Sequence, residues 1–129
     1  MLALDTNVLV RFLVDDDAAQ SAKARKVFER AGDRGLYLSR IVACETVWVL
    51  RSAYEFTRAE IAGTLTRLLG VRQLVVSDSD LIANALDAYA DGKGDFADYL
   101  IREEAIAADC EDVVTFDRTL QQEPGFTAP

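Results

Sequence analysis

The chain has 129 residues, which fits a single domain, and half of them are hydrophobic, which is enough to form an ordinary core. It has no histidine and only two cysteines, which excludes histidine general bases, histidine zinc sites and disulfide scaffolds. The net charge of −8 argues against a nucleic-acid partner, and the absence of a signal peptide or a long apolar stretch predicts a cytoplasmic protein with no membrane partner.

Apolar runs bounded by capping residues predict strands that alternate with helices. In the first half of the chain, short buried strands are expected at residues 2–4 and 36–38. Helices are expected over residues 6–14, 18–31, 40–54 and 57–69. Three of them begin after residues that cap helices well, namely Asp15–Asp17, Ser39 and the Thr57–Glu60 capping box.

The second half continues this alternation. Strands are expected at residues 73–76 and 113–115, and helices over about 77–91 and 95–109 lie between them. The tail after residue 123 is irregular or forms a last edge strand. Short apolar strands separated by helices predict an α/β fold, with helices packed on the faces of a short parallel sheet of four to five strands.

Four carboxylates lie in apolar surroundings, where an unpaired charge costs several kcal/mol. Asp5 and Asp117 each follow the end of an expected strand, and Glu45 is the only charge in residues 41–50. Asp98 lies in the first turn of the helix before the fourth strand. Because sites in parallel sheets form outside the carboxyl ends of the strands, we expect all four acids at one end of the sheet.

Helical spacing adds a detail for Glu45. Residues three and four apart share one side of a helix, so Glu45 shares a face with Ile41 and Trp48. Because both neighbours are large and apolar, this face is expected to be buried or to border the buried face.

Clustered carboxylates favour a hard divalent cation, and Mg²⁺ or Mn²⁺ fits this oxygen-rich set. Such an ion activates a water and stabilises the leaving oxygen when a phosphodiester is cleaved. The hydroxyls of Thr6 and Thr115 and the amide of Asn7 are suited to orient waters or a phosphate. These residues predict a metal-dependent site for phosphodiester chemistry.

Simpler roles exist for the same residues. Asp5 and Asp117 are also suited to cap helices, and Glu45 to lie on an exposed surface. Asp95 and Asp98 occupy helix-start positions that acids favour without any site. The basic stretch at residues 23–34 is either a solvated helix face or a surface that guides RNA or an acidic partner.

In combination, four segments resemble the PIN domain family and occur in its order. They are the Asp-Thr-Asn of residues 5–7, Glu45 in its apolar helix, the Asp-Phe-Ala-Asp of residues 95–98, and the Val-Thr-Phe-Asp of residues 114–117. The resemblance implies a single domain over residues 1–129 with a three-layer α/β/α sandwich. Small stand-alone PIN domains of this length are typically VapC-type toxins of toxin–antitoxin pairs, so the resemblance implies this type.

The resemblance also implies a function and a set of partners. It implies a Mg²⁺- or Mn²⁺-dependent endoribonuclease that forms a homodimer and is inhibited by a VapB-type antitoxin. Asp5, Glu45 and Asp98 match the core acids of the family, Asp117 matches the fourth and most variable acid, and Asp95 is peripheral.

Two other hypotheses stay open from the sequence. One is a receiver-like or phosphatase domain that transfers phosphoryl groups with Mg²⁺, although its only suitable late lysine, Lys93, precedes a helix. The other is a PIN-like interaction domain without catalytic activity.

Overall fold

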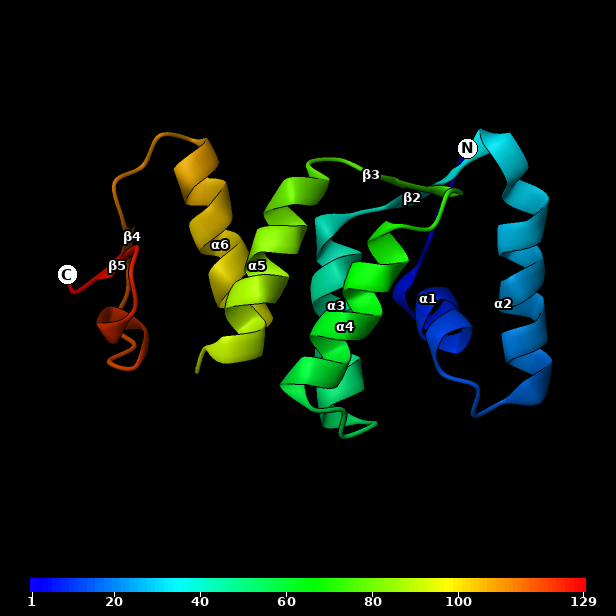
Figure 1. The fold of residues 1–129 in the computed structure, drawn as a ribbon, viewed down its shortest axis with the longest axis horizontal. Helices are drawn as coiled ribbons and strands as arrows, with labels where there is room; N and C mark the ends of the chain where they lie inside the picture. Colours follow the sequence, from blue (N-terminus) through cyan, green and yellow to red (C-terminus); the bar gives the residue numbers. More distant parts are fainter. The chain divides into compact units, whose positions relative to one another are not determined.

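The computed structural model describes residues 1–129 and divides them into two compact units, residues 1–79 and residues 80–129. Figure 1 shows the helices and strands of both units along the chain. No helix combines the length and the apolar character needed to cross a membrane.

The first unit contains a three-stranded parallel sheet with the order β1-β2-β3. The strands are β1 (Leu2–Ala3), β2 (Leu36–Leu38) and β3 (Leu74–Val76). Parallel neighbours need long crossover connections, which helices provide. Helices α1 (Thr6–Leu13) and α2 (Ala18–Ala31) connect β1 to β2, and α3 (Arg40–Ser52) and α4 (Arg58–Leu69) connect β2 to β3. A short 3₁₀ turn, η1 (Gly32–Arg34), follows α2.

Local side-chain hydrogen bonds fix where these helices begin. Asp17 accepts from the Gln20 N–H at 3.0 Å, and Ser39 accepts from the Val42 N–H at 3.1 Å. Thr57 and Glu60 form the reciprocal capping box that the sequence predicts. These caps satisfy amide groups that the first turn of a helix leaves without partners.

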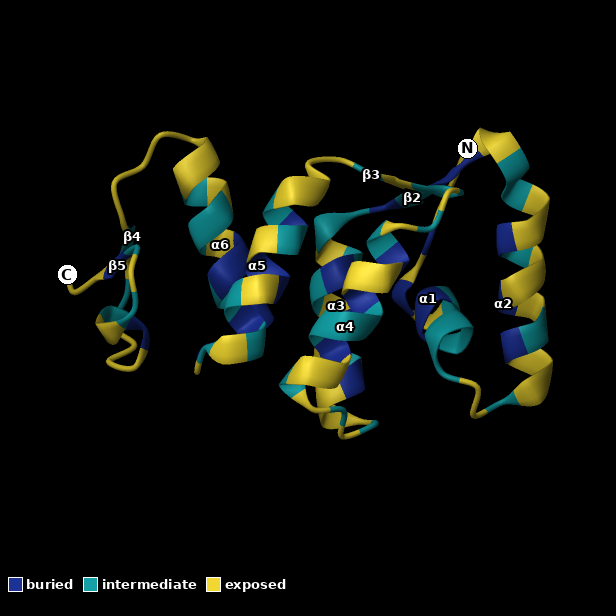
Figure 2. Ribbon diagram, in the orientation of Figure 1, coloured by how far each residue is buried: buried dark blue, intermediate teal, exposed yellow.

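The core of the first unit is aliphatic, and Figure 2 shows it as the dark faces of the helices. Leu9 of α1 and Leu50 of α3 are completely buried. Phe12 of α1 and Phe28 of α2 stack with their ring centroids 3.7 Å apart, which joins these two helices.

The second unit consists of two helices, a 3₁₀ turn and two short strands. The helices are α5 (Ser79–Asp91) and α6 (Phe96–Ala107). They are followed by β4 (Val113–Val114), η2 (Leu120–Gln122) and β5 (Phe126–Thr127). β4 and β5 pair in parallel, with Val113 opposite Phe126.

The α/β class, the parallel pairing and every expected strand and helix are confirmed. The grouping of the strands differs, because hydrogen bonds join three strands in one unit and two in the other rather than one sheet of four to five. The prediction of a buried strand over residues 2–4 is confirmed for Leu4, which is buried, and was wrong for Leu2, which is 68% exposed. β1 lies at the edge of its sheet, so only one side of it is covered by a neighbouring strand. The extent of the domain, residues 1–129, stays a prediction.

Candidate functional site

Asp5 is the N-cap of α1 and follows β1 with one residue, Leu4, between them. Its Oδ1 accepts a hydrogen bond from the Thr6 N–H at 2.8 Å. The side chain is exposed, and Oδ2 makes no hydrogen bond in the structure. The capping role and a role as a metal ligand are therefore compatible, because they use different oxygens of the same carboxylate.

The two residues after Asp5 differ sharply in exposure. Thr6 is buried, and its Oγ1 is the one buried side-chain polar atom without a hydrogen-bond partner. A buried hydroxyl in this state costs about 1–3 kcal/mol. Asn7 is exposed one position further along α1. An unsatisfied buried hydroxyl fits a place where an ordered water completes the hydrogen bonding.

Glu45 lies on the exposed side of α3, so the prediction that its face is buried was wrong. Ile41 and Trp48 share that face, as the spacing predicts, but they are 72% and 70% exposed. The buried stripe of α3 is instead formed by four other residues at helical spacing: Ala43, Thr46, Val47 and Leu50. Glu45 therefore belongs to an exposed patch with two large apolar neighbours.

Asp98 is half-buried in the first turn of α6. Its Oδ2 accepts a hydrogen bond from the Asp95 N–H at 2.9 Å, which ties it to the start of the helix. Burial raises the pKa of Asp98, and the negative charges of Asp95, Asp117 and Glu123 raise it further, against the lowering effect of that hydrogen bond. Asp98 therefore lies in a concentration of negative charge that a cation would relieve.

Asp117 organises the turn after β4. Its Oδ1 accepts from the N–H groups of Thr119 at 2.9 Å and Leu120 at 3.2 Å. Its own N–H donates to Oγ1 of Thr115 at 3.0 Å, and Gln121 donates to the Thr115 carbonyl at 2.7 Å. Asp117 thus begins a short turn, and Thr115 holds the backbone in front of it.

Tyr99 and Glu123 hold together the segments that carry Asp98 and Asp117, and no sequence pattern predicts either residue. Tyr99 is completely buried, and its hydroxyl donates to the Glu123 carboxylate at 2.7 Å. The Gly94 N–H donates to the same hydroxyl at 2.9 Å. Burial raises the pKa of Tyr99, and the hydrogen bond to Glu123 raises it further. This tyrosine therefore connects the segment before α6 to the segment after η2, on either side of Asp98 and Asp117.

The comparison with known families decides the assignment. The PIN domain model matches residues 2–124, which covers nearly the whole chain and includes parts of both units. The chain belongs to the PIN domain family. PIN domains are generally nucleases that act on nucleic acids and need divalent metals. A search of curated proteins gave no match.

The donor chemistry of this PIN domain fits such a metal. Asp5 and Glu45 lie in the first unit, and Asp98 and Asp117 lie in the second with Asp95 and Glu123. Neither unit by itself brings three acidic or cysteine side chains close enough to hold an ion. All these donors are carboxylate oxygens, which Mg²⁺ and Mn²⁺ prefer. The carboxylates of each unit are therefore chemically suited to a divalent ion.

Proposed function

We propose that this PIN domain is a Mg²⁺- or Mn²⁺-dependent endoribonuclease with Asp5, Glu45, Asp98 and Asp117 as its metal-binding acids. The observation that carries the proposal is the family match over residues 2–124, which contains all four acids. The exposed Oδ2 of Asp5 and the concentrated negative charge around Asp98 support it.

The proposed roles follow from the hydrogen bonds. When bound, the divalent ion activates a water for attack on the phosphodiester and stabilises the leaving oxygen. Asp95 positions Asp98 through its backbone N–H, and Thr115 positions Asp117 through its hydroxyl. The hydroxyl of Thr6 and the amide of Asn7 orient water or a substrate phosphate beside Asp5.

We further propose a VapC-type toxin that forms a homodimer and is neutralised by a VapB-type antitoxin. The Asp-Thr-Asn and Asp-Phe-Ala-Asp segments support the toxin type. The exposed Ile41 and Trp48 on α3 support an interface, since large apolar groups on a surface favour a protein partner. A cytoplasmic location also stays a prediction.

Helix α2 carries exposed positive charges that are suited to RNA, although the net charge of the chain is negative. The chain is acidic overall, but Lys23, Arg25, Lys26 and Arg30 are all exposed on this one helix. Electrostatic attraction to RNA depends on such a local concentration of positive charge. No observation favours a receiver-like domain, because Lys93 lies between α5 and α6 rather than after a strand.

Cleavage of single-stranded RNA by the purified protein tests the proposal. We expect cleavage with Mn²⁺, none with a chelator, and a loss of at least about 100-fold in Asp5→Asn and Asp98→Asn. Asp87→Asn is the matched control, because Asp87 is an exposed acid on α5 outside the proposed site. Expression of the same two variants should relieve growth inhibition. Undiminished cleavage by both, without metal, would refute the proposal.

A further inference from the structure

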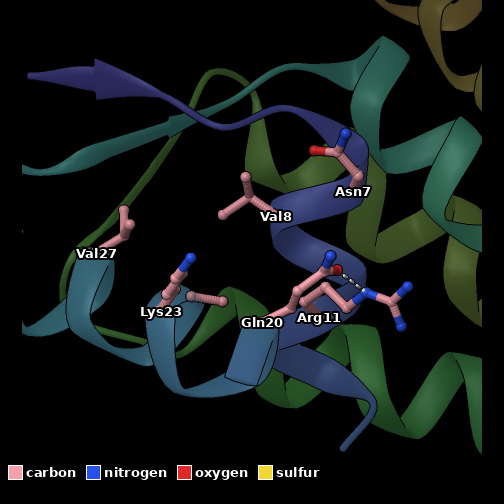
Figure 3. A pocket seen from close by; sticks show the side chains of 7 residues that line it. Asn7, Val8, Arg11, Gln20, Lys23 and Val27 are labelled. Carbon is pink, nitrogen blue, oxygen red and sulfur yellow. Dashed lines mark hydrogen bonds between the residues drawn. The ribbon is translucent and has the colours of Figure 1, made fainter. Parts of the chain in front are cut away.

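A pocket of about 510 Å³ lies between α1 and α2 of the first unit. Figure 3 shows its lining, with Asn7, Val8 and Arg11 on α1 facing Gln20, Lys23 and Val27 on α2. Its volume falls within the range of small-molecule and cofactor sites. None of the four proposed metal-binding acids lines it.

The pocket is lined by two cations, Arg11 and Lys23, and only one of them is free to bind an anion. Arg11 is occupied, since its guanidinium contacts Asp16 at 2.6 Å and donates to Gln20 at 2.7 Å. Lys23 is exposed and makes no ion pair or hydrogen bond in the structure. Lys23 is therefore the lining cation that can bind an anion without first breaking an internal contact.

The remaining lining suits a nucleobase. Val8 and Val27 provide apolar surface, against which the flat face of a base can pack. Asn7 carries an amide, with one acceptor and two donor hydrogens, that suits the polar edge of a base. Gln20 uses its Oε1 for Arg11, which leaves its amide hydrogens as donors. An apolar wall, amide groups and one cation together fit a base with its phosphate.

The pocket begins close to the first proposed metal ligand. Asn7, which lines it, is two residues after Asp5, so their positions differ by about 3 Å along the axis of α1, although their side chains leave the helix in different directions. A strand that passes from Asp5 around the first turn of α1 would place an adjacent nucleotide near the mouth of the pocket.

We propose that the α1–α2 pocket binds the nucleotide next to the scissile phosphate of the RNA substrate. Lys23 contacts its phosphate, Val8 and Val27 pack against its base, and the amide hydrogens of Gln20 contact the edge of the base. This inference rests on the proposed nuclease function and adds a substrate-binding residue, Lys23, that is separate from the metal-binding acids.

Binding of a short fluorescein-labelled single-stranded RNA, measured by anisotropy with a chelator present, tests the pocket without any cleavage. We expect Lys23→Ala to weaken binding about three- to ten-fold, as for one partly solvated charge-assisted hydrogen bond. The plot of log affinity against log salt should also become less steep by about 0.7, because one phosphate contact is lost. In cleavage with Mn²⁺, KM should rise while kcat stays near the wild-type value.

Lys26→Ala is the matched control, because Lys26 is an exposed lysine on the same helix that does not line the pocket. Equal effects of the two substitutions on binding and salt slope would overturn the pocket and leave only general attraction to α2. Unchanged RNA binding by Lys23→Ala would overturn the pocket as a nucleotide site. A wild-type protein that neither binds nor cleaves RNA would overturn the nuclease proposal itself, and the pocket with it.

Discussion

Replacing Tyr99 by Phe removes one hydroxyl and two hydrogen bonds from the second unit. The bond to the Glu123 carboxylate is worth about 1.5–3 kcal/mol and the bond from the Gly94 N–H about 1 kcal/mol. Glu123 is half-buried, so water can hydrate part of its carboxylate after the substitution. We therefore expect Tyr99→Phe to lower the free energy of unfolding by about 2–3 kcal/mol, measured by urea denaturation.

Two further variants separate this effect from the general effect of removing a hydroxyl. Glu123→Gln keeps an oxygen acceptor for Tyr99 but no charge, so it should lose less, about 1 kcal/mol. Tyr37→Phe should change the free energy of unfolding by less than about 0.5 kcal/mol, because the Tyr37 hydroxyl makes no hydrogen bond in the structure. A loss in Tyr99→Phe no larger than that in Tyr37→Phe would refute the role assigned to the buried hydroxyl.

Three further predictions concern packing, assembly and pH. Gly92→Ala should lower the free energy of unfolding by about 2 kcal/mol in urea denaturation, because an added Cβ overlaps the buried hydroxyl of Tyr99. Gly63→Ala in α4 should raise it by about 0.5–1 kcal/mol in the same experiment, because only the tip of the Arg67 side chain lies near the added Cβ. Trp48→Glu should shift the protein from dimer to monomer in sedimentation without loss of helical signal, and a wild-type protein that sediments as a monomer would contradict this. The hydrogen bond from Tyr54, and after it the one from Arg11, lower the pKa of Asp16 below its ordinary value of 3.8. The Asp16 carboxylate therefore stabilises the fold fully above pH 3.8, and this stabilisation is lost as the pH falls through the lower pKa of the folded protein. The wild-type advantage over Asp16→Asn in thermal unfolding should therefore disappear in acid, and an advantage that is independent of pH would argue against this contact.

Helix starts are the part of this fold that the sequence predicts best. Asp17, Ser39 and Thr57 each bond to an amide three residues ahead, so the information lies within one helical turn. Strand positions follow from short apolar runs in the same way. The grouping of strands into sheets depends on contacts between residues that are far apart in the sequence. Local sequence patterns carry no information about these contacts.

The errors at the candidate site have the same physical origin. Helix α3 has apolar residues on every side around Glu45, so its periodicity does not indicate which side is buried. The partnership of Tyr99 with Glu123 spans 24 residues and ends in a tail without regular spacing. The sequence predicts the local positions of Asp5 and Asp117, because each follows a short strand and caps the next turn, which are local features.

The proposed nuclease function depends on binding of the divalent ion by Asp5 and by Asp98. Calorimetric titration with Mn²⁺ of the wild type, Asp5→Asn, Asp98→Asn and the control Asp87→Asn measures this binding without any RNA. We predict that Asp5→Asn and Asp98→Asn each weaken Mn²⁺ binding at least about ten-fold, because each substitution removes a carboxylate ligand, and that Asp87→Asn keeps the wild-type affinity. Full Mn²⁺ affinity in Asp5→Asn or in Asp98→Asn would contradict metal binding by that acid.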